Sequence, residues 1–341
     1  MTTIFVTGGA GFIGSNFVRY ILGEYPEFKV INLDKLTYAG NLENLKDIEN
    51  NPNYNFVHGD ICDKKIVFKI MAESDLVVHF AAETHVDRSV LDAGQFITTD
   101  VYGTFVMLEA TKKYRPKKFV HISTDEVYGD VINEPCKEED PLFPKSPYAA
   151  SKAGADRLVY SYFKTYDVPA IITRCVNNYG QYQYPEKLIP LFITNILEGK
   201  KVPVYGTGKN TREWIHVIDH CEAIYKILSS ENHFGEVFNI GTGEEYSVLD
   251  ITETILEFFS KSRDFIDFVE DRPGHVLRHA INSEKFSNTF KTRPKQSIKK
   301  SINDIIKWYV DNEKWWKNIK QKQQEYIQFY EKQYNNKGKQ H

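Results

Sequence analysis

The sequence predicts an α/β fold built on a doubly wound parallel sheet, followed by a smaller mixed α/β region. Three observations predict it. Short apolar runs alternate with helix-period segments through the first half of the chain. The runs are nearly all apolar, as strands covered on both faces are. A glycine-rich turn joins the first run to the first helical segment. Folds of this class have right-handed crossovers and bind ligands at the carboxyl ends of their strands.

The alternation of runs defines the elements of the first half in order. Strands are expected at Ile4–Thr7, Lys29–Asp34, Tyr54–Gly59, Leu76–Ala81, Lys118–Ser123 and Ala170–Arg174. The helices between them are expected at Phe12–Leu22, Lys64–Met71, Gly94–Lys113 and Pro147–Tyr166. The last begins at a proline, which the first turn of a helix tolerates well. This βαβα order predicts a parallel sheet with helices on both faces.

The pattern changes after Gly180, where prolines and a Gly206-Thr207-Gly208 turn interrupt the rhythm. We therefore expect a first domain over 1–180 and a smaller second domain over 181–325. Strand-like segments near 212–218 and 236–240 are expected to return to the sheet of the first domain, so the two domains are interleaved.

Composition limits the class of function. Hydrophobic residues make up 41% and charged residues 26% of the 341 residues, as in a soluble globular protein. The net charge of -3 gives no reason to expect nucleic acid or a membrane surface as a partner. The chain enters its first strand directly, so we expect no signal peptide. Four scattered cysteines, without C-x-x-C spacing, indicate reduced thiols in a cytoplasmic protein and no metal site.

The glycine-rich turn Thr7-Gly8-Gly9-Ala10-Gly11-Phe12-Ile13-Gly14 is typical of a dinucleotide site. Glycines let the backbone approach a pyrophosphate, and the helix N-terminus supplies N–H groups. Asp34 closes the second strand 20 residues after Gly14. Its carboxylate would bind the ribose hydroxyls and repel a 2′-phosphate, which favours NAD over NADP. Glycines that make only a tight turn are the weaker alternative, because the strand–turn–helix context and the acidic residue coincide.

Further cofactor contacts are expected where the first four strands end. For Asp60, a role as an ordinary turn residue is equally compatible with the sequence. The small residues at 81 and 82 would also allow a helix to pack closely against the sheet. The full expected set is Gly8, Gly11, Phe12, Ile13, Gly14, Asp34, Lys35, Asp60, Ile61, Ala81 and Ala82.

A tyrosine and a lysine at i and i+4 lie on one face of the helix expected from Pro147. The ammonium of Lys152, with a nicotinamide cation, would lower the pKa of Tyr148 toward neutrality. A tyrosinate can then take a proton from a sugar hydroxyl while hydride leaves the same carbon. The Y-x-x-x-K spacing alone often occurs by chance. It indicates a catalytic pair here because it follows the predicted strands at the position expected in this class of fold.

Together the glycine turn, the Tyr148/Lys152 pair and Asn177-Asn178-Tyr179-Gly180 resemble the extended short-chain dehydrogenase/reductase family. The resemblance runs from residue 1 to about 310. It implies an NAD-binding Rossmann domain over 1–180, in which Tyr148 and Lys152 also contact the cofactor, and a nucleotide-sugar-binding domain over 181–325. It also suggests a homodimer that pairs the helices around 95–113 and 148–166.

The segment Ser123-Thr124-Asp125-Glu126-Val127-Tyr128-Gly129 resembles the Thr-Asp-Glu signature of the dTDP-glucose 4,6-dehydratases within that family. The chemistry needs these residue types. Oxidation at C4 of the hexose acidifies the C5 proton, which Glu126 would remove. Protonated Asp125 would give its proton to the departing C6 hydroxyl, and Thr124 would hydrogen-bond the C4 hydroxyl. Hydride return to C6 then gives a 4-keto-6-deoxy sugar. Two neighbouring carboxyls raise one pKa and keep one group protonated.

Substrate contacts are expected mainly from the second domain. Arg212 and Arg272 would bind the diphosphate, because guanidinium forks match phosphate oxygens. Asn178 would bind a phosphate or the sugar, and Lys187 and Leu188 would offer backbone groups to the base. Three further positions complete the expected set: Thr84, Asn239 and His275. A structural role for His275 is equally compatible with the sequence.

Alternative functions stay open at this point. The segment Val276–Asn282 departs from the usual Asp-Arg-Arg-Tyr-Ala-Ile-Asp of the dTDP-glucose enzymes, which leaves UDP-glucose as a possible substrate. A nucleotide-sugar 4-epimerase would need Tyr148 and Lys152 but no acid–base pair. A dinucleotide-sensing regulator would need only the glycine turn, so it explains the fewest residues.

Overall fold

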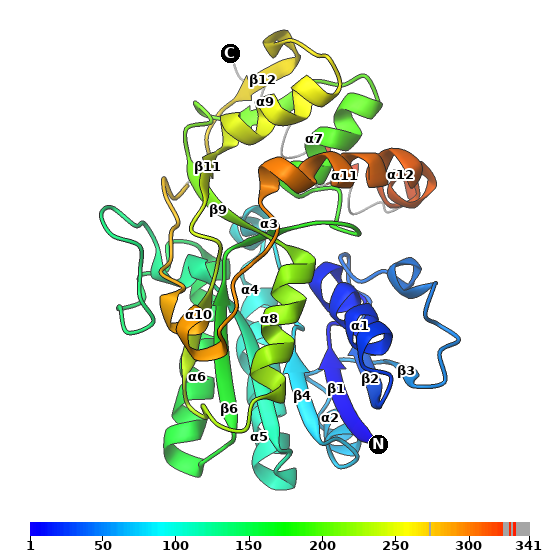
Figure 1. The fold of residues 1–341 in the computed structure, drawn as a ribbon, viewed down its shortest axis with the longest axis vertical. Helices are drawn as coiled ribbons and strands as arrows, with labels where there is room; N and C mark the ends of the chain where they lie inside the picture. The colour runs from blue at the N-terminus through cyan, green and yellow to red at the C-terminus, as the bar shows by residue number, and fades with distance from the viewer. Residues whose placement is uncertain (273, 323–326, 329, 332–341) are drawn as a thin grey trace.

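Parallel strands form a seven-stranded sheet at the centre of the larger lobe in Figure 1. The structure is a computed structural model that describes residues 1–272, 274–322, 327–328 and 330–331. Within them the sheet order is β3-β2-β1-β4-β5-β6-β10, the Rossmann order with one strand added at the edge. Its strands are β1 (Thr2–Thr7), β2 (Phe28–Asp34), β3 (Tyr54–His58), β4 (Leu76–His79), β5 (Lys118–Thr124), β6 (Ala170–Cys175) and β10 (Val237–Ile240). The predicted doubly wound Rossmann fold is confirmed.

Helices cover both faces of this sheet because successive strand residues are apolar on both sides. Ile4 and Val6 pack with α1 (Phe12–Glu24) and α8 (Val217–Ser229). Phe5, between them, packs in a second cluster with α2 (Lys64–Met71), α5 (Thr104–Tyr114) and α6 (Pro147–Tyr166). The predicted bounds of α2 and α6 match the structure. None of the helices in the described part of the chain combines the length and hydrophobicity needed to span a membrane.

Two segments beside the cofactor side of the sheet differ from the expected pattern. The helix expected over Gly94–Lys113 is α4 (Gly94–Phe96), the π-helix η2 (Ile97–Gly103) and then α5. A short helix, α3 (Val86–Leu91), lies between the expected strand that ends at Ala81 and the expected helix that begins at Gly94. In η2, Asp100 is buried and accepts a hydrogen bond from the Ser151 hydroxyl of α6 at 2.6 Å. The wider π turn thus brings a polar side chain into contact with α6. Hydrophobic periodicity alone does not reveal such a turn.

The smaller lobe, at the top of Figure 1, is built from helices packed on two small sheets. Its helices are α7 (Leu188–Leu197), α9 (Val248–Phe258), α11 (Ile298–Asp311) and α12 (Glu313–Lys322). One sheet has β7 (Asn177–Tyr179), β9 (Thr211–His216) and β11 (Glu245–Ser247), and the other pairs β8 (Val202–Tyr205) with β12 (Ile266–Val269). The remaining elements are η1 (Leu42–Leu45), η3 (Asp125–Tyr128), η4 (Arg263–Phe265) and α10 (Glu284–Phe290). Buried Tyr179, Tyr309 and Trp316 join the lobe's core.

The two segments expected to return to the large sheet have different positions. Val237–Ile240 does return, pairing in parallel with β6 as β10. The expectation for 212–218 was wrong, because β9 pairs with β7 and β11 in the small sheet. Because β10 occupies the edge of the large sheet beside β6, β9 forms its backbone hydrogen bonds in the small sheet. Of the segment 211–229, the helix α8 packs on the large sheet and the strand β9 does not join it. The boundary at 180/181 remains a proposal, and residues 323–325 of the expected second domain lie outside the described residues.

Candidate active site

A cavity of about 430 Å³ lies at the carboxyl ends of the central strands, within the size range of small-molecule sites. Nearly all the predicted site residues line it. They are Gly8, Gly11, Phe12, Ile13, Gly14, Asp34, Lys35, Asp60, Ile61, Ala81, Ala82, Thr84, Thr124, Glu126, Tyr148, Lys152, Asn178, Lys187, Leu188, Arg212, Arg272 and His275. Asp125 and Asn239 do not line the cavity.

The glycine turn has the geometry of a pyrophosphate cradle. Gly8 has φ +72°, and a Cβ there would lie 2.7 Å from the Ala81 nitrogen. A Cβ on Gly14 would lie 2.3 Å from the Gly8 oxygen. Gly11 begins α1 without a side-chain cap, so the first N–H groups of the helix face the cavity unshielded by a side chain. These residues fit the diphosphate of a dinucleotide.

Asp34 and its neighbours favour NAD. One Asp34 carboxyl oxygen accepts from the Ala10 backbone N–H at 2.9 Å, and the other accepts from Leu36 at 2.8 Å. Those bonds fix the carboxyl at the end of β2. The Lys35 ammonium pairs with the Asp60 carboxylate at 2.7 Å. Because Asp60 neutralises Lys35, that lysine offers little attraction to a 2′-phosphate.

Helix α6 places the Tyr148/Lys152 pair in the cavity. Ser146 caps the helix by accepting from the Ala149 backbone N–H, and Pro147 occupies its first turn. Lys152 is buried and donates to the Ile122 carbonyl at 2.8 Å, where burial lowers the pKa of its ammonium. The lysine is thereby held in one position beneath the cavity.

The protein's own groups raise the pKa of Tyr148, whereas the expected lowering also counted a nicotinamide cation. Burial raises the pKa of its phenol well above the usual value, and the charges of Glu126 and Asp100 raise it further, while a hydrogen bond with Thr124 lowers it. Sequence reasoning counted only the cations around this phenol. The carboxyls that face it come from two other elements, η3 and η2.

The carboxyl pair follows β5 directly, in the short helix η3. Asp125 is 2% exposed, and burial together with the charges of Glu126 and Glu213 raises its pKa to about 8. Burial also raises the pKa of Glu126, but Arg272, Arg212 and Lys187 oppose that rise. Asp125 faces mainly acidic neighbours and Glu126 mainly basic ones, so the proton resides preferentially on Asp125. This asymmetry suits an acid at 125 and a base at 126.

The two arginines meet at the inner wall of the cavity. Arg272 pairs with Asp87 at 2.9 Å, and the Tyr205 hydroxyl donates to the other Asp87 oxygen at 3.1 Å. Arg212 donates to the Val276 carbonyl at 2.8 Å. Asp87 and Tyr205 line the cavity and were missed by sequence reasoning. No local sequence pattern indicates the Asp87–Arg272 pair, because the two residues are 185 positions apart.

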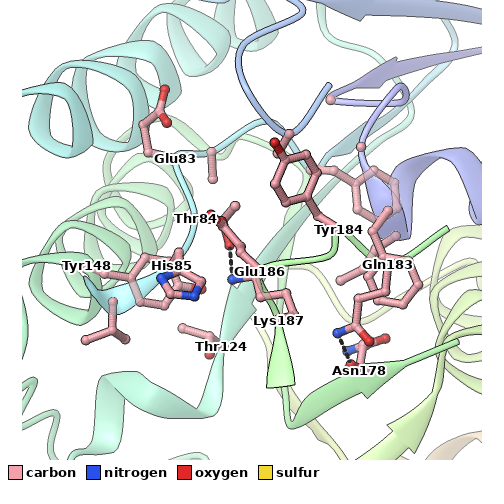
Figure 2. Close-up of a pocket in the computed structure, with 18 of the residues that line it drawn as sticks. Glu83, Thr84, His85, Thr124, Tyr148, Asn178, Gln183, Tyr184, Glu186 and Lys187 are labelled. Carbon is pink, nitrogen blue, oxygen red and sulfur yellow. Dashed lines mark hydrogen bonds between the residues drawn. The ribbon is translucent and has the colours of Figure 1, made fainter. Parts of the chain in front are cut away.

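The other predicted substrate residues that line the cavity are Thr84, Asn178, Lys187, Leu188 and His275. Figure 2 shows Tyr148 and Thr124 on one side of the pocket, and Asn178 and Gln183 on the other. Between them the Lys187 ammonium donates to the Thr84 hydroxyl at 3.1 Å. The Asn178 side-chain oxygen lies 2.9 Å from the His220 ring, which fixes the amide. His275 lies 2.6 Å from Asp271 and lines the cavity.

Asn239 was predicted to bind substrate, and the structure places it elsewhere. Its side-chain oxygen accepts from the Tyr128 hydroxyl at 2.9 Å, and its nitrogen donates to the Cys136 carbonyl at 2.9 Å. It is fully buried in β10. Because these hydrogen bonds already satisfy the Asn239 amide inside the protein, the side chain does not bind a ligand in the cavity. Among the described residues, no cluster of three or more His, Cys, Asp or Glu side chains could hold a metal ion.

Known proteins are similar to this chain over most of its length. The sequence profile of the GDP-mannose 4,6 dehydratase family matches residues 5–305. A dTDP-glucose 4,6-dehydratase of Streptomyces niveus is 48% identical over 93% of this chain and 95% of its own. A dTDP-glucose 4,6-dehydratase of Bacillus anthracis, solved in complex with NAD, is 47% identical with a TM-score of 0.87, covering 94% of this chain and all of that one. DesIV of Streptomyces venezuelae, a dTDP-glucose 4,6-dehydratase solved with NAD and TYD bound, is 44% identical with a TM-score of 0.91, covering 93% and 100%.

Proposed function

This chain belongs to the GDP-mannose 4,6 dehydratase family of extended short-chain dehydrogenases/reductases, and from that premise we propose that it is a dTDP-glucose 4,6-dehydratase. As a lyase it converts dTDP-glucose to dTDP-4-keto-6-deoxyglucose and water, a step of deoxysugar biosynthesis. One observation carries the assignment to this chain's own residues: at the end of β5, Asp125 is buried and Glu126 lines the cavity, and the charges of both carboxyls act on Tyr148. A 4-epimerase has no use for that pair.

The chain's own residues divide the proton transfers among them. NAD, when bound, supplies a hydride acceptor next to the hexose and a positive ring charge. Tyr148 takes the proton of the C4 hydroxyl, and Thr124 hydrogen-bonds that hydroxyl. Lys152, fixed by the Ile122 carbonyl, supplies positive charge under Tyr148. Because burial and, after it, the protein's acidic groups raise the pKa of Tyr148, positive charge beside the phenol is what makes it a base.

Elimination then uses the carboxyl pair. Glu126 lines the cavity and removes the C5 proton, and the three cations around it favour its ionised form. Asp125 does not line the cavity itself but accepts a hydrogen bond at 3.2 Å from Thr124, which does. From this position just behind the cavity wall, Asp125 carries the proton that converts the C6 hydroxyl into a leaving water. Arg212 and Arg272 bind the diphosphate and so hold C5 and C6 against the two carboxyls. Each proton transfer contributes about 10²–10⁴-fold in rate.

Products from purified protein test the assignment. The protein is incubated separately with dTDP-, UDP-, CDP- and GDP-hexoses, and each product is weighed by mass spectrometry. We expect loss of one water from dTDP-glucose, at a higher kcat/KM than from UDP-glucose. Interconversion of hexoses without any change in mass would instead identify a 4-epimerase.

Dehydration should slow as the pH rises through about 8, the pKa of Asp125. Asp125 must be protonated to act as the acid, and its proton is present below that pH and lost above it. Loss of the Tyr148 proton acts in the opposite direction, because it creates the base. The test is the pH profile of kcat for the native enzyme and for Asp125→Asn. An alkaline limb that persists unchanged in Asp125→Asn belongs to another group, such as Lys152.

A homodimer through η2, α5 and α6 is part of the proposal. Large apolar side chains are exposed along these helices: Ile97, Tyr102, Phe105, Tyr160 and Tyr166. Such a patch on a soluble protein usually marks an interface. We expect light scattering to show a dimer at micromolar concentration, and Phe105→Glu to shift it toward monomer. A native protein that scatters as a monomer would remove this part of the proposal.

A cytoplasmic location is also proposed, because all four cysteines lie in the described residues and are free.

A further inference from the structure

A second and much smaller cavity lies on another side of Glu126. Glu126, Arg212, Arg272 and Val86 line both this cavity and the large one. The remaining walls include Lys145, Ser146 and Ala149 from the start of α6, together with His279. Its volume is about 10 Å³, close to the smallest space that holds one water molecule.

Two buried polar atoms on these walls are not paired within the protein. Arg272 Nε and His279 Nδ1 have no hydrogen-bond partner among the described residues. Arg272 is held by its Nη1 bond to Asp87, and His279, 2% exposed, has a hydrogen bond to the Gly129 backbone. Leaving such groups unpaired is costly, and in a polar cavity of this size an ordered water normally pairs with them.

The small cavity extends from the reacting carboxyl toward the protein surface. The Lys145 side chain on its wall is 50% exposed and forms an ion pair with Asp130. The nucleotide sugar and the cofactor would fill the large cavity during the reaction. A carboxyl enclosed on that side needs another route to solvent, and the small cavity, whose lining includes the half-exposed Lys145, is the candidate route.

We propose that the small cavity holds a water molecule that exchanges the proton of Glu126 with solvent during the reaction, and that His279 positions this water. The proposal rests on the proposed function, in which Glu126 takes the C5 proton. His279 does not line the large cavity, so it touches neither cofactor nor substrate. It acts through the water and is a positioning residue.

The exchange balances in protons and electrons. Glu126 takes the C5 proton, and the electron pair of that C–H bond forms the C5–C6 double bond while the C6 hydroxyl leaves as water with the proton of Asp125. The protonated Glu126 passes its proton to the cavity water and receives another from it. Hydride returns to C6, and the exchanged proton of Glu126 goes to C5. The C5 hydrogen of the product therefore comes from solvent.

The test follows the hydrogen at C5 during turnover in D₂O, read by NMR and mass spectrometry. The native enzyme should place deuterium at C5. His279→Phe keeps a ring of similar size but removes Nδ1, and should raise the ratio of retained to exchanged hydrogen at C5 roughly tenfold, as expected for loss of one hydrogen bond to the water. His279→Gln, which restores a polar atom, should return the ratio toward the native value.

Other causes of slow turnover give a different result. A variant that is merely damaged turns over more slowly and has more time for exchange, so its retained hydrogen would fall or stay the same. If His279→Phe does not fold, Ala149→Val, which adds two methyl groups to the wall, should raise the same ratio. An unchanged ratio in the folded variants, or retention of hydrogen by the native enzyme, would overturn the proposal. Failure of the proposed function is distinct, because no dehydrated product would form at all.

Discussion

Glu126→Gln should lower kcat for dehydration by about 10²–10⁴-fold, the usual contribution of one positioned acid–base group. Glutamine keeps the shape of the side chain in the cavity but cannot take the C5 proton. Oxidation at C4 does not use this carboxyl, so the variant should still oxidise substrate. The measurements are steady-state kcat and the absorbance of the reduced cofactor after mixing with dTDP-glucose. We expect the reduced form to accumulate in the variant more than in the native enzyme.

The matched control is Glu139→Gln, the same chemical change at an exposed residue away from the cavity. It should keep native kcat. Native dehydration by Glu126→Gln would remove the elimination mechanism, even if the protein still bound NAD.

Tyr148→Phe should lower kcat by a similar factor of about 10²–10⁴, but at an earlier step. Phenylalanine keeps the ring packed against Phe96, whose centroid lies 6.2 Å away, and removes the hydroxyl that takes the C4 proton. No reduced cofactor should form, in contrast to Glu126→Gln. Cofactor binding should survive, because the glycine turn and Asp34 are unchanged.

Tyr225→Phe on α8 is the control, since that partly exposed side chain lies outside both the cavity and the proposed dimer surface. If Tyr148→Phe still reduced the cofactor at the native rate, another group would be the base at C4. The two active-site variants together therefore separate oxidation from elimination.

Much of the fold follows from local pattern. Buried parallel strands are nearly all apolar, and the turn after β1 carries its own glycine signal, so the sheet and the cofactor cradle are predictable from the sequence. Helix α6 is predictable to its ends because Ser146 and Pro147 begin it. The positions of Thr124 and Glu126 on the cavity wall are also predictable, since the end of a central strand faces the ligand in this class of fold, whereas Asp125 between them is buried away from the wall.

Contacts between residues far apart in the chain were not predictable from local pattern. The sequence of β9 fits either sheet, and the edge already occupied by β10 decides the outcome. The Asp87–Arg272 pair joins two residues far apart in the chain. Asn239 has the chemistry of a sugar ligand, but Tyr128 and Cys136 satisfy it in the core. The pKa of Tyr148 is raised by burial and then by carboxyls from other elements, and only the assembled site produces both.

The central claim is that hydride removed from C4 returns to C6 after the carboxyl pair has eliminated water. Its most direct test is turnover of dTDP-glucose that carries deuterium at C4, with the label located in the product by NMR. The account predicts deuterium on C6 of a 4-keto-6-deoxy sugar. Deuterium that stays on C4, or that is lost to solvent without any label at C6, would contradict it.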